Sequence, residues 1–83
     1  MRLIDYKELM EQKPTLLGCT ANNKGQHIKF FEHPQGEESS VIGVINEVAF
    51  NTGFYDLSDF SMLSEYNPVL HNDGTVMCEF ETN

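Results

Sequence analysis

Positive charge is missing from most of this 83-residue sequence, because no lysine or arginine occurs after Lys29. All five basic residues lie in the first 29 positions, whereas ten of the 13 acidic residues lie from Phe30 onward. The net charge of −8 therefore comes from the later two-thirds of the chain. Affinity for nucleic-acid phosphates comes from Lys and Arg, so we expect no direct binding to DNA or RNA and a partner of positive charge.

Long hydrophobic runs are also missing. The longest apolar runs have about five residues, far short of the roughly 20 needed to cross a bilayer. The first residues, MRLIDYKELMEQ, bring in charges before any apolar stretch as long as that of a signal peptide. We expect a cytoplasmic protein with no membrane role, in which Cys19 and Cys78 stay reduced and are buried as small apolar side chains.

Motifs for catalysis and for cofactors are absent as well. Zinc sites need ligand pairs at short spacing, and no such spacing joins the candidate ligands, which are Cys19, His27, His33, His71 and Cys78. The sequence has no nucleophile elbow and no glycine-rich phosphate loop. We therefore predict a protein that is not an enzyme and that holds no metal and no cofactor.

The composition indicates one folded domain over residues 1–83. Single hydrophobic cores usually organise about 50 to 200 residues, which leaves no room for a second one. With 40% hydrophobic and 11% aromatic residues, the chain differs from disordered proteins in spite of its acidity.

A helix is predicted at the start of the chain. Asp5 and Glu8 have the spacing of a capping box, and Ile4 before the cap can pack on Leu9 as a hydrophobic staple. The next proline disfavours helical backbone in the residue before it, so the helix should end near Gln12.

Three hairpins are predicted after this helix. TLLGCTA and QHIKFFEH flank NNKG, SVIGVI and VAFNTGF flank NE, and PVLH and TVMCEFE flank NDG. Asp73-Gly74 suits a type I′ turn. In the second hairpin, VIGVI has no polar alternation, which indicates either a central strand covered on both faces or one that completes its burial in a dimer.

The predicted fold class is α+β. A second, short helix is predicted in DLSDFSMLSEYNP, beginning at Asp56 or Ser58. The whole is then a small single domain with a mainly antiparallel sheet of about 4–6 strands and with both helices packed on one face.

Residues 51–74 combine aromatic side chains with carboxylates and contain no Lys or Arg. A solvated surface that only keeps the protein soluble remains the simpler interpretation, but such a surface usually mixes both signs of charge. Aromatic rings beside carboxylates are suited to holding Arg and Lys side chains. The residues that we predict to contact a partner are Glu37, Glu38, Asp56, Asp59, Glu65 and Asp73, with Tyr55 and Tyr66 as anchors.

The leading functional hypothesis is a small acidic binding protein that inhibits a nucleic-acid-handling protein by docking on its basic groove. Phage-type inhibitors of host defence and acidic DNA mimics have a similar size and charge. The alternative is an adaptor subunit that forms a homodimer through VIGVI and VAF, with an incidental acidic surface. A small enzyme or ligand-binding protein is the third hypothesis.

Overall fold

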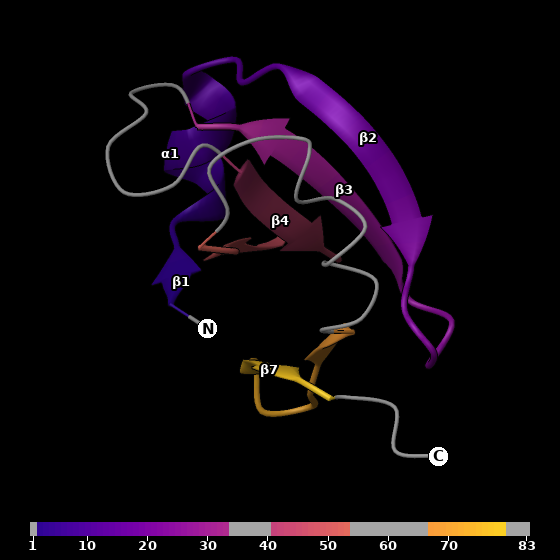
Figure 1. Cartoon of the computed structure of the whole chain (residues 1–83). Helices are drawn as coiled ribbons and strands as arrows, with labels where there is room; N and C mark the ends of the chain where they lie inside the picture. The colour runs from indigo at the N-terminus through magenta and orange to yellow at the C-terminus, as the bar shows by residue number, and fades with distance from the viewer. Residues whose placement is uncertain (1, 34–40, 54–66, 80–83) are drawn as a thin grey trace.

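The structure is a computed structural model that describes residues 2–33, 41–53 and 67–79 (Figure 1). Strands β1 to β5 form an antiparallel sheet in the order β1-β5-β4-β3-β2, and β6 pairs with β7 in a separate two-stranded sheet. The elements are β1 (Leu3–Ile4), α1 (Tyr6–Glu11), β2 (Leu16–Ala21), β3 (His27–Glu32), β4 (Val41–Ile45), β5 (Val48–Asn51), β6 (Pro68–Leu70) and β7 (Val76–Cys78).

Helix α1 begins and ends where the sequence predicts. Asp5 Oδ1 accepts a hydrogen bond from the N–H of Glu8 at 3.1 Å, which satisfies one of the free donors of the first turn. Gln12 caps the other end, and its N–H bonds back to Leu9. Ile4 packs against the same core cluster as Leu9, as a staple requires. No helix within the described ranges is long and apolar enough to cross a membrane.

Strand β4 lies at the centre of the larger sheet, and all five of its residues are buried. Val41 and Ile45 join a core cluster on one face of the sheet, whereas Ile42 and Val44 join a second cluster on the other face. The uniform hydrophobicity of VIGVI is thus explained by cover on both faces, and the burial of β4 is complete within one chain.

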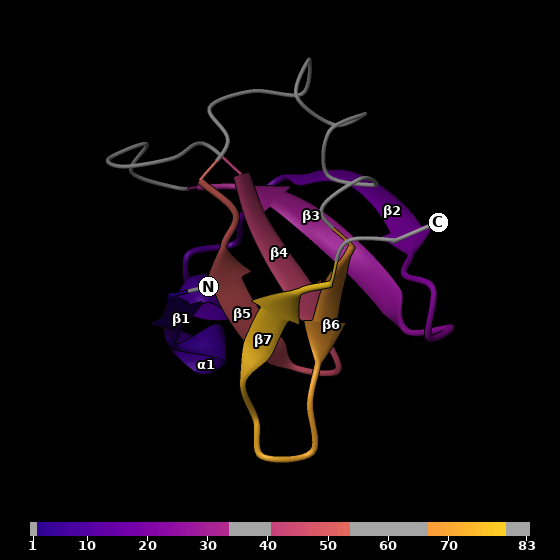
Figure 2. The same cartoon turned by 60° about the horizontal axis from the view of Figure 1, so that its bottom comes forward.

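The two faces of the sheet are covered by different elements (Figure 2). Helix α1 packs through Leu9 on one face, and the β6–β7 hairpin packs through Val76 on the other. The predicted antiparallel sheet of about 4–6 strands is thus confirmed by the five strands β1 to β5, whereas the third predicted hairpin forms a separate two-stranded sheet. Val76 and Leu70 are register partners on one side of this hairpin, and they bury that apolar side against Phe30 and Phe50 of the sheet. The predicted second helix lies outside the described residues.

The predicted strand pairs form, but one turn differs from its prediction. Gly74 has φ +88° and its N–H bonds to His71 O at 3.0 Å, while Asp73 has no positive φ. This is a type I turn closed by a left-handed glycine, so the predicted type I′ turn was wrong. The positive φ values of a type I′ turn occur instead at Asn46 (+47°) and Glu47 (+65°), between β4 and β5.

Candidate functional site

The predicted contact residues fall mostly outside the part of the chain that the structure describes. Asp73 is the one that it places, at the tip of the β6–β7 hairpin. The others are Glu37, Glu38, Tyr55, Asp56, Asp59, Glu65 and Tyr66. The candidate site is therefore built from the hairpin itself, residues 67–79.

Asp73 is an exposed carboxylate held in a fixed orientation. Its Oδ1 accepts hydrogen bonds from the Thr75 hydroxyl at 2.6 Å and from the Thr75 N–H at 3.0 Å. These bonds favour the charged form and hold the pKa of Asp73 below its ordinary value. The hairpin tip thus presents a permanent negative charge at neutral pH.

A second carboxylate lies at the far end of β7. Glu79 Oε1 is 3.1 Å from His71 Nε2, but the ring N–H is not aligned for a hydrogen bond, so the contact is an ion pair when His71 is protonated. Between the two acids, Met77 is 57% exposed and supplies an apolar contact surface. Residues 67–79 contain no Lys or Arg.

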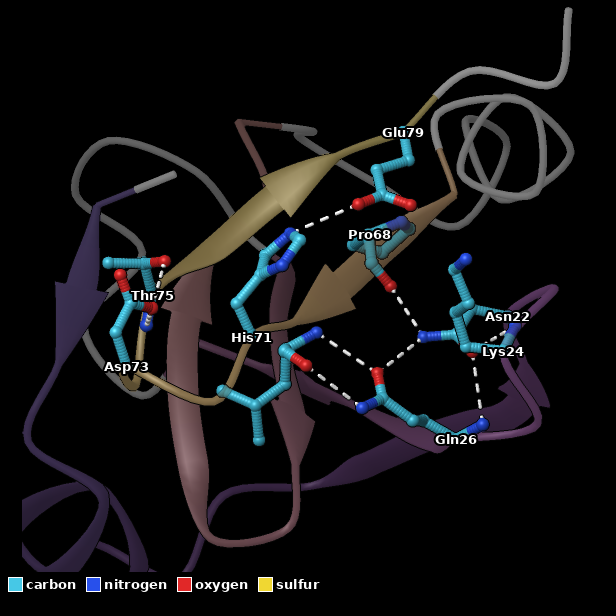
Figure 3. A network of polar contacts seen from close by, with 9 residues as sticks. Asn22, Lys24, Gln26, Pro68, His71, Asp73, Thr75 and Glu79 are labelled. Carbon is cyan, nitrogen blue, oxygen red and sulfur yellow. Dashed lines mark hydrogen bonds and ion pairs between the residues drawn. The ribbon is translucent and has the colours of Figure 1, made fainter.

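An amide clamp, formed by the side chains of Asn22 and Gln26, fixes the hairpin to the β2–β3 turn (Figure 3). Asn22 Nδ2 donates to Pro68 O at 2.9 Å and to Gln26 Oε1 at 2.8 Å. Gln26 Nε2 donates to Leu70 O at 2.9 Å, and its Oε1 accepts from Leu70 N at 3.0 Å. The two amides thus satisfy main-chain groups along the edge of β6, where another strand would otherwise pair.

The side chain of Asn22 also stabilises the β2–β3 turn itself. Asn22 Oδ1 accepts hydrogen bonds from the N–H groups of Lys24 and Gln26, both at 3.0 Å. Asn67 adds another bond between the hairpin and this turn, because its Oδ1 accepts a hydrogen bond from the N–H of Asn23 at 2.9 Å. Sequence reasoning placed a turn at NNKG but did not identify the clamp, whose partners lie more than 40 positions away.

The described lysines of α1 and β3 lie on the helix face of the sheet, which also carries Glu8 and Glu11, and no lysine lies in the hairpin. Lys7 belongs to α1, and Lys29 of β3 lines a groove beside Tyr6 on the same face. Asp73 and Glu79 belong to the hairpin on the other face. The described acids of the hairpin therefore lie on the face of the sheet opposite to the lysines of the helix face.

The cysteines differ from their prediction. Cys19 is exposed on the edge strand β2, so its expected burial was wrong, while Cys78 is partly buried. Burial raises the pKa of the Cys78 thiol. An edge strand has fewer neighbours than a central one, and this local position is not visible in residue type.

The described residues contain no group of three or more His, Cys, Asp or Glu side chains that could hold a metal ion. No family model matches the chain, and neither a curated protein nor a solved structure matches it.

Proposed function

We propose that the protein is a small acidic, non-enzymatic binding protein whose carboxylates dock on the basic surface of a nucleic-acid-handling protein and block it. The observation that carries this proposal is the β6–β7 hairpin: it bears two carboxylates and an exposed Met77, and it contains no Lys or Arg. An apolar contact between carboxylates is an arrangement that gives both contact area and selection for a basic partner.

The position of the hairpin supports this role physically. It packs on the sheet through Val76, which is 1% exposed, and is held at β6 by the amide clamp, so its acids are presented on an ordered element. An ordered surface loses little conformational entropy on binding. The remaining acids of the sequence add a long-range field that steers a basic partner toward the protein.

The first test is a pull-down with the tagged chain as bait. Nuclease-treated lysate of the native host is applied at about 50 and 500 mM salt. A specific partner should be lost at high salt and should be released by added DNA or RNA, because the acids and the phosphates compete for one basic surface. A captured protein that nucleic acid does not displace would contradict the proposal.

Charge reversal on the hairpin is the sharper test. Asp73→Lys with Glu79→Lys should weaken binding by about 2 kcal/mol or more if both acids contact the partner. The matched control is Glu8→Lys with Glu11→Lys, two exposed acids of α1 on the other face. Equal losses of affinity from both pairs would show that only overall charge matters. No loss of affinity from either pair would show that these acids serve only to keep the protein soluble.

The predicted loop and second-helix acids are tested in the same assay. Asp56→Lys with Asp59→Lys should match the loss of the hairpin pair if both belong to one docking face. The alternative, a homodimer through VIGVI and VAF, would need apolar side chains that a partner can reach. Val44 and Ala49 are 6% and 0% exposed, so light scattering should give a monomer mass if those strands are the only basis for association.

A further inference from the structure

A groove lies on the face of the sheet that α1 covers only in part. Helix α1 has six residues and is therefore about 9 Å long, whereas the six residues of β3 extend over about 20 Å. The uncovered region between them encloses a volume of about 410 Å³. This volume lies in the range of about 300–1,000 Å³ that is typical of small-ligand sites.

The lining of this groove is mainly apolar. Tyr6 and Met10, one helical turn apart on α1, form one wall, and Phe31 of β3 forms the other. All three are only partly buried, and Val44 is buried beneath them. Aromatic and thioether side chains left half open to water gain free energy when an apolar body displaces that water.

The cationic part of the lining is Lys29. Its register partners on the neighbouring strands are Cys19 and Val44, which carry no carboxylate. No ion pair or side-chain hydrogen bond joins Lys29 to another residue in the part of the chain that the structure describes. In a chain with 13 acids and five bases, an ammonium group that has no carboxylate partner among the described residues and lies above an apolar surface leaves a place for an external anion.

The other polar groups of the lining are compatible with that ligand. His27 lies two positions before Lys29 on the same face of β3, so it can add a second positive charge when protonated. Asn46 and Glu47 come from the β4–β5 turn. Glu47 is exposed, so water screens its carboxylate, which can accept a hydrogen bond from a hydroxyl or amino group of a ligand.

We propose that this groove is a binding site for a small organic anion with an aromatic or aliphatic body. The anionic group lies on Lys29, and the body lies against Tyr6, Met10 and Phe31. The site is independent of the acidic hairpin, which packs on the opposite face of the sheet.

The probe for the test is 8-anilinonaphthalene-1-sulfonate, an aromatic body that carries one sulfonate. Its fluorescence should rise saturably with a Kd of about 10–500 µM, as expected for a ligand of this size. Chemical shift changes in the NMR spectrum of the folded chain should concentrate at Phe31 and Val44. Absence of saturable binding, or shift changes centred on another surface, would overturn the proposal.

Two lysine variants separate a specific contact from overall charge. Lys29→Gln should weaken binding of the probe about tenfold, because it removes a charge-assisted hydrogen bond. Lys24→Gln, an exposed lysine of the β2–β3 turn that does not line the groove, should leave the Kd within about twofold. Equal effects of the two variants, or no effect of Lys29→Gln, would overturn the assignment.

The wild-type chain gives a second test that needs no variant. N-phenyl-1-naphthylamine has a similar aromatic body without the sulfonate, so it should bind about tenfold more weakly than the probe. Equal binding of the two dyes would show that the groove selects only apolar surface and would contradict the proposed anion site.

Discussion

Gln26 pairs its side-chain amide with both main-chain polar groups of Leu70, donating to the carbonyl at 2.9 Å and accepting from the N–H at 3.0 Å. This geometry imitates one step of a β ladder, with a side chain in place of a strand. It joins the β2–β3 turn to a hairpin 44 positions later and thereby orients the candidate docking surface.

Replacing this amide should destabilise the protein and loosen the hairpin. Gln26→Ala leaves two partly buried main-chain groups of Leu70 without partners, so the free energy of unfolding should fall by about 1–3 kcal/mol. Urea denaturation measures the loss, and amide exchange should speed up at Leu70. Gln12→Ala, at an exposed glutamine after α1, is the control and should change stability by less than about 0.5 kcal/mol. Equal losses would contradict a specific role of Gln26.

Gly43→Ala should be strongly destabilising. Gly43 is the register partner of Phe50, and an added Cβ would lie 2.6 Å from Cε2 of that buried ring. Both positions are buried in the central strands, so the clash cannot be relieved toward solvent, and we expect a loss of about 2–4 kcal/mol. In the double variant, Phe50→Leu should cost less in the presence of Gly43→Ala than in its absence. Strict additivity of the two losses would contradict the clash.

Neighbouring residues in the sequence predict much of this fold, and the elements that were missed depend on contacts between distant residues. The cap at Asp5 and the uniform hydrophobicity of Val41–Ile45 predicted α1 and the central strand, because each signal acts within a few residues. Strand β1 was missed, since Leu3–Ile4 is a strand only through pairing with β5, for example Leu3 with Phe50. No periodicity can appear in two residues.

The candidate site was predictable only in part. The turn around Asp73 was expected from NDG, but the placement of its hairpin depends on Asn22 and Gln26, and nothing local marks these amides as partners of β6. The groove was missed for a similar reason. Lys29 and Phe31 are two positions apart on β3 and so share a face, but the shortness of α1 is what leaves that face open.

Glu47→Gly should stabilise the protein. Glu47 has φ +65°, a left-handed conformation that strains residues with a Cβ and that glycine adopts freely. Relief of this strain exceeds the added flexibility of the unfolded chain, so we expect a gain of about 0.5–1 kcal/mol in thermal or urea unfolding. The control is Glu32→Gly in the regular strand β3, which should instead lose about 0.5–1 kcal/mol. A loss at position 47 would contradict the turn geometry.

The two cysteines should differ in reactivity toward an aromatic disulfide reagent. Cys19 is exposed, whereas partial burial of Cys78 raises its pKa and lowers its thiolate fraction. At pH 8 we expect Cys19 to react at least about tenfold faster, so Cys19→Ser should remove the fast phase of the reaction. Both thiols should react at similar rates in denaturant. A fast phase that survives in Cys19→Ser would contradict the exposure of the two side chains.

Lowering the pH should protonate Asp73 and so remove the negative charge at the hairpin tip. Its pKa is held below the ordinary value of 3.8, chiefly by the Thr75 hydroxyl and then by the Thr75 N–H. Because the folded-state pKa is the lower one, the contribution of Asp73 to stability is full above the unfolded pKa and is lost as the pH falls through the folded pKa. Thr75→Val removes the hydroxyl donor but keeps the N–H, so carboxyl titration followed by NMR should show the pKa of Asp73 rising toward 3.8. In the control Thr52→Val, whose hydroxyl donates to Val41 O at 2.7 Å instead, the pKa of Asp73 should stay unchanged. The same pKa of Asp73 in Thr75→Val and in the wild type would show that the hydrogen bond from the Thr75 hydroxyl does not lower that pKa.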